Sequence, residues 1–193
     1  MASPGWLWIR EPGAARWAEG ERALSDAGFA CSDIELDVSS DRASLARIET
    51  ALRELGARPD VDERNLGVIG IGLGGTLALL AGCTSRRVRA VACLQPVLVF
   101  PDLSAARPFQ PIELLLNLDV PLLAVLGGRD CRATPEHVAL FRRQCELGAK
   151  NIELLECAES GPELFGAPSP ARRASDAAAA LGRLLAFAAD TLQ

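Results

Sequence analysis

The sequence predicts an α/β fold, a doubly wound and mostly parallel sheet of six strands, in a single domain spanning residues 1–193. Short apolar segments alternate with segments of helical periodicity along the whole chain, as in a parallel sheet covered by helices. These apolar segments show little polar alternation, which is typical of strands buried on both faces. A length of 193 residues suits one hydrophobic core.

In the first half of the chain, each predicted element is bounded by residues that terminate it. Glycines follow both helical segments, and a serine or aspartate precedes the second. The strands are apolar runs between these limits. In chain order we expect a strand at 6–9, a helix at 14–28, a strand at 29–36, a helix at 44–55 capped by Ser40 or Asp41, and a strand at 66–71.

The second half continues this alternation with one longer interruption. Several prolines break the segment that follows the fourth strand, and a proline in the first turn marks the start of the next helix. In chain order we expect a helix at 73–82, a strand at 88–94, an excursion at 97–119, a strand at 121–128, a helix at 135–148, a strand at 151–157 and an Ala-rich helix at 169–192.

Composition and charge exclude several classes of function. The formal net charge is -5 and basic residues do not cluster with aromatic ones, so nucleic acid and anionic membranes are not expected partners. No apolar run is long enough to span a membrane, and the first residues lack a signal-peptide pattern, so we expect a cytoplasmic protein. The six cysteines include no CxxC pair, which predicts buried thiols rather than disulfide bridges and no metal site. No cofactor is expected.

A glycine-rich turn, Gly70-Ile71-Gly72-Leu73-Gly74-Gly75, separates an apolar strand from an apolar helix. Its spacing fits the dinucleotide fingerprint GxGxxG, in which glycines let a diphosphate approach a helix N-terminus. The next strand, however, ends without the acidic residue that would hold a ribose hydroxyl, and two strand–helix units precede the motif. The turn fits better with a nucleophile elbow, G-x-nucleophile-x-G, in which position 72 is the nucleophile.

The residues around this turn resemble the dienelactone hydrolase family, which has the α/β-hydrolase fold. VDERNLGVIGIGLGGTLALLAG resembles the elbow region of that family. PLLAVLGGRD, followed by PEHVALFRRQCELGAKNIELLEC, resembles its acid-bearing strand and the helix and strand after it. The resemblance covers roughly residues 6 to 190. It implies an α/β-hydrolase fold that is trimmed at its N-terminus, because the usual first two strands have no counterpart.

Carried over residue by residue, the resemblance implies a site in which two of three catalytic groups are replaced. The nucleophile, a Cys or Ser in active members, falls on Gly72, and the acid falls on Asp130. The histidine position falls on Glu163. Glu11 resembles a glutamate that the family often places after its first core strand.

Acidic side chains and one backbone donor are what this site retains. The carboxylates could act as acid or base without a covalent intermediate, and the N–H of Leu73 at a helix N-terminus could still bind an oxyanion. The candidate catalytic residues are therefore Asp130, Glu163 and Glu11. The candidate ligand-binding residues, at the carboxyl ends of strands, are Gly72, Leu73 and Pro96.

Structural roles are the alternative for the same residues. Asp130 could brace its own loop or pair with Arg129 or Arg132, and the two glutamates could be solvated. His137, the single histidine, is expected to be an exposed residue at a helix start. Cys131 and Cys157 flank the expected site without a base partner, so they are expected to be buried and inert.

We favour a non-hydrolytic homologue that binds a small molecule or a protein partner. One alternative is an enzyme of altered chemistry, a lyase, isomerase or cyclase, that uses the carboxylates as acid or base. A hydrolase with a displaced nucleophile and a nucleotide-binding protein are the remaining alternatives. Because the strand at 29–36 would lie at a sheet edge, we also expect that this edge or the 97–119 excursion takes part in a homodimer.

Overall fold

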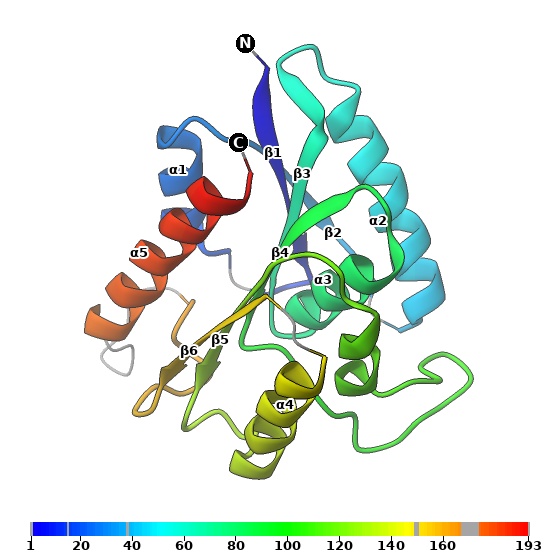
Figure 1. The fold of residues 1–193 in the computed structure, drawn as a ribbon, viewed down its shortest axis with the longest axis vertical. Coiled ribbons are helices and arrows are strands. Elements are labelled where there is room, and N and C mark those ends of the chain that lie inside the picture. The colour runs from blue at the N-terminus through cyan, green and yellow to red at the C-terminus, as the bar shows by residue number, and fades with distance from the viewer. Residues whose placement is uncertain (1, 15, 38, 149–150, 167–173, 193) are drawn as a thin grey trace.

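A computed structural model describes residues 2–14, 16–37, 39–148, 151–166 and 174–192 of the chain. Within these residues, six strands form one parallel sheet in the order β2-β1-β3-β4-β5-β6 (Figure 1). This confirms the predicted α/β architecture. The strands are β1 (Ser3–Arg10), β2 (Ala30–Glu35), β3 (Val61–Ile71), β4 (Val88–Leu94), β5 (Leu122–Gly127) and β6 (Ile152–Cys157).

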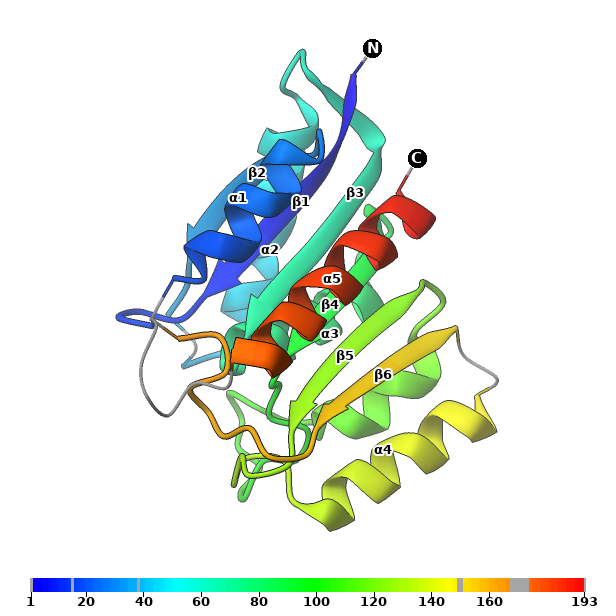
Figure 2. The same ribbon diagram turned by 90° about the vertical axis from the view of Figure 1, so that its left-hand side faces the viewer.

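Helices cover both faces of the sheet. Figure 2 shows α1 and α5 together on one face, and α2 and α3 lie on the other. A short 3₁₀ helix, η1, packs against α3 and α4 on that second face. The helices are α1 (Ala18–Asp26), α2 (Asp41–Gly56), α3 (Leu73–Thr84), η1 (Pro111–Asn117), α4 (Pro135–Leu147) and α5 (Ala174–Thr191).

Alternating side chains of the strands build a separate core on each face. In β1, Leu7 and Ile9 join the core beneath α2 and α3. Trp6 and Trp8 point the other way into the core beneath α1 and α5, and both are fully buried. The apolar character of these strands on both faces is therefore explained by burial between two helical layers.

Several predicted boundaries shift in the structure. The first helix was expected from residue 14, but α1 begins at Ala18 because Glu11 starts a tight turn instead. The third strand extends back to Val61, well before the apolar run that predicted it. The last helix is described from Ala174, and residues 169–173 of the predicted helix lie outside the described residues. Ser40 is the N-cap of α2, as expected.

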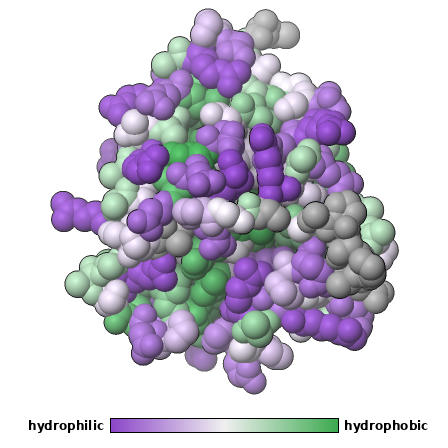
Figure 3. Space-filling view, turned by 180° about the vertical axis from the view of Figure 1, so that it is seen from behind, coloured by the Kyte–Doolittle hydropathy of each residue, from purple (hydrophilic) through white to green (hydrophobic). Residues whose placement is uncertain are grey.

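The structure can be compared with the expectations about the sheet edge, the cysteines and membrane-spanning segments. Strand β2 is an edge strand, as predicted, whereas its pairing in a homodimer stays a prediction. The six cysteines, all within the described ranges, are free thiols, but the expectation that they are buried holds only for Cys93 and Cys157. Among the described residues, no helix has the length and hydropathy needed to cross a membrane. Seen from behind, the surface is largely hydrophilic with hydrophobic residues between (Figure 3).

Glycines at the β3–α3 turn allow three backbone segments to meet. A Cβ on Gly70 would clash with the backbone of Gly74 and would lie 2.7 Å from the nitrogen of Gly75. A Cβ on Gly74 would clash with the carbonyl group of Ile9 at the end of β1. The turn therefore has its shape because β3, α3 and β1 are in direct backbone contact.

Replacing Gly70 by alanine should destabilise the protein by about 3 kcal/mol, because the added methyl group overlaps backbone that cannot move independently. Gly182→Ala is the matched control: it lies exposed in α5, and nothing lies within 4 Å of its added Cβ. The control should stabilise the protein by roughly 0.5–1 kcal/mol, because alanine is the better helix former. Urea unfolding of both variants tests this, and equal effects would contradict the packing argument.

Candidate active site

Gly72 forms the tip of the sharp turn between β3 and α3. Its backbone has φ 61° and ψ -127°, and it is the residue that caps the N-terminus of α3. Its N–H donates to the carbonyl oxygen of Leu94 at the end of β4, at 2.9 Å. A side chain in this conformation is strained, which is the backbone that a nucleophile elbow imposes on its nucleophile. The turn thus keeps the elbow geometry with a glycine at its tip.

The N–H of Leu73 is the first backbone donor of α3. The first N–H groups of a helix have no partner within the helix, and they lie at its positive end. Leu73 follows the tip of the turn directly, so this N–H is available at the carboxyl edge of the sheet. The predicted backbone donor of the site is therefore present.

Two charged side chains border the space above Gly72. A Cβ on residue 72 would lie 3.0 Å from Nη1 of Arg132 and 3.0 Å from Oε1 of Glu11. Glu11 comes from the loop after β1, and Arg132 comes from the loop after β5. The structure thus brings Glu11, Gly72 and Leu73 together, and it adds a cation to this part of the site.

Asp130 is buried, with 3% of its surface exposed, and it binds Arg132 through both carboxylate oxygens. Nε of Arg132 donates to Oδ1 at 2.9 Å, and Nη2 donates to Oδ2 at 2.7 Å. The backbone N–H of Arg132 also donates to Oδ1, at 3.0 Å. The structural roles considered for Asp130, bracing its loop and pairing with an arginine, are both present. Arg129 pairs with Glu159 instead.

The neighbours of Arg132 keep its side chain positively charged. Its hydrogen bond to Asp130 and the charges of Asp130 and Glu11 raise the pKa of Arg132, so the guanidinium stays protonated. Arg132 therefore stands as a cation near both acidic residues, so this part of the site is not a cluster of carboxylates alone.

Glu11 stands at the start of a turn that follows β1. The N–H of Ala14 donates to the carbonyl oxygen of Glu11 at 3.1 Å, and Gly13 has φ 72°. Proline at the second position and a positive φ at the third are the features of a type II turn. Among the described residues, no hydrogen bond or ion pair involves the Glu11 carboxylate. The turn therefore presents this half-buried carboxylate to the site, where its charge acts on Arg132 from beyond ion-pair distance.

Glu163 lies in the loop after β6 and turns back onto its own backbone. Its Oε1 accepts a hydrogen bond from the N–H of Gly161 at 3.3 Å. The side chain is half-buried, and no hydrogen bond or ion pair joins it to Asp130 or Glu11. The structure thus gives Glu163 a local contact in the loop where the resemblance places the family's histidine, and its catalytic role stays a prediction.

The loop that carries Glu163 is fixed to the body of the protein by buried polar groups. Nε2 of Gln95 donates to the carbonyl oxygen of Gly161 at 2.7 Å, and Gln95 is 1% exposed. The hydroxyl of Ser160 donates to Asp176 in α5 at 2.7 Å, and Ser160 is fully buried. Gln95 was missed by the sequence analysis, because a positive φ of 50° on a glutamine has no sequence signal.

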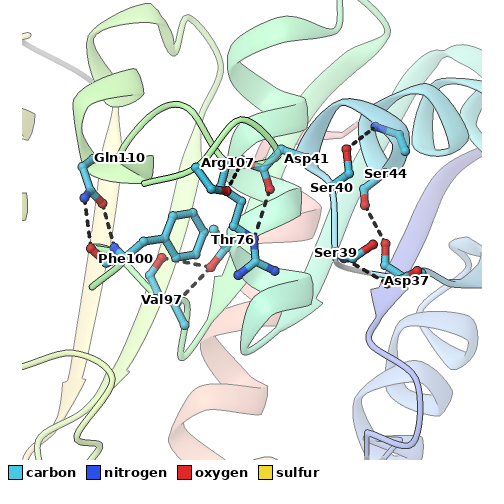
Figure 4. A network of polar contacts seen from close by, with 12 residues as sticks. Asp37, Ser39, Ser40, Asp41, Ser44, Thr76, Val97, Phe100, Arg107 and Gln110 are labelled. Carbon is cyan, nitrogen blue, oxygen red and sulfur yellow. Dashed lines mark hydrogen bonds and ion pairs between the residues drawn. The ribbon is translucent and has the colours of Figure 1, made fainter. Parts of the chain in front are cut away.

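Pro96 is buried directly after β4, next to the first turn of α3. The hydroxyl of Thr76 donates to the carbonyl oxygen of Val97 and accepts from its N–H, both at 2.9 Å (Figure 4). This double contact holds the chain after Pro96 against α3. The predicted contact between Pro96 and a ligand stays a prediction.

The segment beyond Val97 is tied down near the helix N-termini (Figure 4). The side chain of Gln110 bonds to the N–H and the carbonyl group of Phe100, at 2.7 and 3.0 Å. Arg107 lies over the Phe100 ring, 4.9 Å from its centre, and 3.8 Å from Asp41. Phe100 and Arg107 also line a small hollow beside Leu73. Phe100 and Arg107 therefore lie beside the first turn of α3.

Two expectations about residues near the site need correction. His137 lies in the first turn of α4, as predicted, but it is half-buried rather than exposed, and its Nδ1 is buried without a hydrogen-bond partner. Cys131 is exposed rather than buried, because it follows Asp130 in a surface loop. Cys157 is buried as expected, and burial raises the pKa of its thiol to about 11.

The described residues offer no obvious set of ligands for a metal ion. Among them, no group of three or more His, Cys, Asp or Glu side chains is arranged to hold a metal ion.

The arrangement of charges around Gly72 argues against the nucleotide-binding alternative. A charged pair stands where a diphosphate would approach Gly72, and one member of it, Glu11, would repel the phosphate.

Solved structures share this fold over nearly the whole chain. A protein from Klebsiella pneumoniae subsp. pneumoniae MGH 78578, assigned as a dienelactone hydrolase, matches with a TM-score of 0.84 at 17% identity, over 97% of this chain and 87% of that chain. The dienelactone hydrolase-like promiscuous phosphotriesterase P91 from metagenomic libraries matches with a TM-score of 0.76 at 19% identity, over 100% and 88%. At such identities these likenesses show the fold.

A family model and a curated relative extend the comparison to the sequence. A "Probable 2-oxo-3-(5-oxofuran-2-ylidene)propanoate lactonase" from Bradyrhizobium sp is 26% identical over 121 residues, which are 63% of this chain and 48% of that protein. This chain therefore spans about half the length of the curated relative that it matches. The model of the dienelactone hydrolase family matches residues 27–156, which is more than half of the chain. The chain belongs to the dienelactone hydrolase family.

Proposed function

We propose that this chain is a non-hydrolytic member of the dienelactone hydrolase family that binds a small molecule above Gly72. The observation that carries the proposal is the tip of the elbow. Glycine supplies no atom that could attack a carbonyl carbon, and Arg132 and Glu11 border the space that a nucleophilic side chain would enter. Hydrolysis through an acyl-enzyme needs a nucleophile, a base and a group that orients the base.

The contacts of Asp130 and Glu163, at the other two predicted catalytic positions, support the same proposal. Asp130 uses both carboxylate oxygens to bind Arg132, so it serves as the counter-ion of a cation. The loop where the family has its histidine contains Glu163, which bonds to Gly161 of the same loop. The activity in the name of the Bradyrhizobium relative is therefore not carried over to this chain.

The site offers three polar groups to a ligand. The N–H of Leu73 is a donor at a helix N-terminus, and Nη1 of Arg132 is the guanidinium nitrogen left free by Asp130. Glu11 adds an acceptor close to Gly72. Binding in a small-molecule site depends on a few well-placed polar groups, and the helix start and the pair with Asp130 hold the donors of Leu73 and Arg132 in place.

One observation favours a second candidate function, an enzyme of altered chemistry with Glu11 as acid or base. Glu11 is the predicted catalytic carboxylate that has no hydrogen bond or ion pair among the described residues, and it faces the space above Gly72. Such an enzyme would form a product from a metabolite mixture that mass spectrometry detects with the wild type and not with Glu11→Gln. Product formation that survives in Glu11→Gln would exclude this role.

The purified chain should not hydrolyse p-nitrophenyl acetate faster than its Asp130→Asn variant, because neither contains a nucleophile–histidine pair. Release of p-nitrophenolate, followed by absorbance, measures both rates, and an active hydrolase of the family serves as the positive control. Substantial hydrolysis of p-nitrophenyl acetate by the wild type that is lost in Asp130→Asn would contradict the proposal.

Asp130→Asn should lower the free energy of unfolding by about 2 kcal/mol, because it leaves Arg132 without the carboxylate that binds it. Glu159→Gln is the matched control, since it breaks an exposed ion pair with Arg129 and should change stability by less than about 1 kcal/mol. Urea unfolding measures both. A loss in the control as large as that in Asp130→Asn would argue against a structural role for the buried pair.

Iodoacetamide at pH 8 should modify Cys131 well before Cys157. The Cys131 thiol is exposed, whereas Cys157 is buried and its pKa of about 11 leaves about one thiolate in a thousand at this pH. Peptide mass spectrometry gives the two rates. Cys131 should react no faster than glutathione in the same solution, because no base is bonded to it among the described residues. A much faster reaction would instead support a displaced nucleophile.

A further inference from the structure

The charged groups above Gly72 have opposite signs and face a common point. Nη1 of Arg132 and Oε1 of Glu11 each lie 3.0 Å from the position that a Cβ on residue 72 would take. The two atoms are therefore separated by no more than the sum of these distances. A ligand that approaches Gly72 would therefore meet a hydrogen-bond donor and a carboxylate close to each other.

The balance of charge in the cluster limits which ligands fit. Asp130 and Arg132 form a buried, bidentate pair whose charges cancel. Glu11 then leaves the cluster with a net negative charge, which disfavours a simple anion. A simple cation would satisfy Glu11, but it would leave Nη1 of Arg132 and the N–H of Leu73 without an acceptor.

We propose that the ligand is a small zwitterion, with an amino group and a carboxylate on the same or adjacent carbon atoms, as in an α-amino acid. This inference rests on the proposed function and deepens it by naming the class of ligand. The ammonium group donates to Glu11, and the carboxylate accepts from Nη1 of Arg132 and from the N–H of Leu73. Each charged group of the ligand then has an oppositely charged or donating partner.

The probe must carry both charged groups and a side chain that adds no further charge. The hollow beside the first turn of α3 is lined by Asp41 and Arg107 as well as by apolar residues, and it is too narrow for a ligand side chain. L-leucine is the probe of choice because its N-acetyl and amide derivatives each remove one of its two charges.

Isothermal titration calorimetry at pH 7 with three matched probes tests the inference. L-leucine carries both charged groups, N-acetyl-L-leucine lacks the cationic one, and L-leucinamide lacks the anionic one. L-leucine should bind at least about tenfold more tightly than either of the others, because each of them loses one charge-assisted contact. N-acetyl-L-leucine binding as tightly as L-leucine would overturn the zwitterion and leave an anion-binding site.

Variants locate the binding and separate this inference from the proposed function. Glu11→Gln should weaken L-leucine binding by about tenfold or more, without weakening that of N-acetyl-L-leucine. Glu159→Gln removes an equal charge from an exposed surface pair and should leave L-leucine binding unchanged. Absence of binding by all three probes would overturn the inference, whereas the absence of hydrolysis is decided independently by the p-nitrophenyl acetate assay.

Discussion

Direct backbone contact at the glycine turn is the constraint on which the rest of the site depends. Gly70 lies against Gly74, and Gly74 lies against the carbonyl group of Ile9, so no side chain mediates the contact of β3, α3 and β1. The shape of the elbow is therefore independent of what stands at position 72. It fixes the N–H of Leu73 at the carboxyl edge of the sheet and brings the end of β1 beside it.

The charged cluster follows from the burial of an aspartate that binds an arginine. A carboxylate that is almost fully buried requires a cation or several hydrogen-bond donors. Arg132 supplies both from two residues along the chain, through its guanidinium and its backbone N–H. Retention of Asp130 is thus explained by the stability of its loop, and the aspartate does not by itself imply that catalysis is retained. A second effect of the pair is to aim Nη1 of Arg132 at Gly72.

The fold could be predicted from sequence because each strand and helix carries a local pattern, and the glycine turn marks where the site must lie. The contacts within the site could not be predicted in the same way. Arg129 directly precedes Asp130 and Arg132 follows it by two residues, and the path of the loop decides that Arg132 binds it while Arg129 reaches Glu159. The exposure of Cys131 depends on that same path. Such choices depend on the three-dimensional course of loops and leave no periodic signal.

The anchoring of the loop after β6 bears on what the site can do. Gln95 binds it from the end of β4, Ser160 binds α5 through Asp176, and the N–H of Arg129 donates to the carbonyl oxygen of Ser160. A loop that is held from three elements keeps its position whether or not it carries a histidine. Together with the elbow it forms a rigid frame, which lowers the cost of ordering the site around a ligand. Within that frame, the proposed ligand would contact Glu11 and Nη1 of Arg132, and because the Glu11 carboxylate has no hydrogen bond or ion pair among the described residues, we expect its substitution to change binding selectivity rather than architecture.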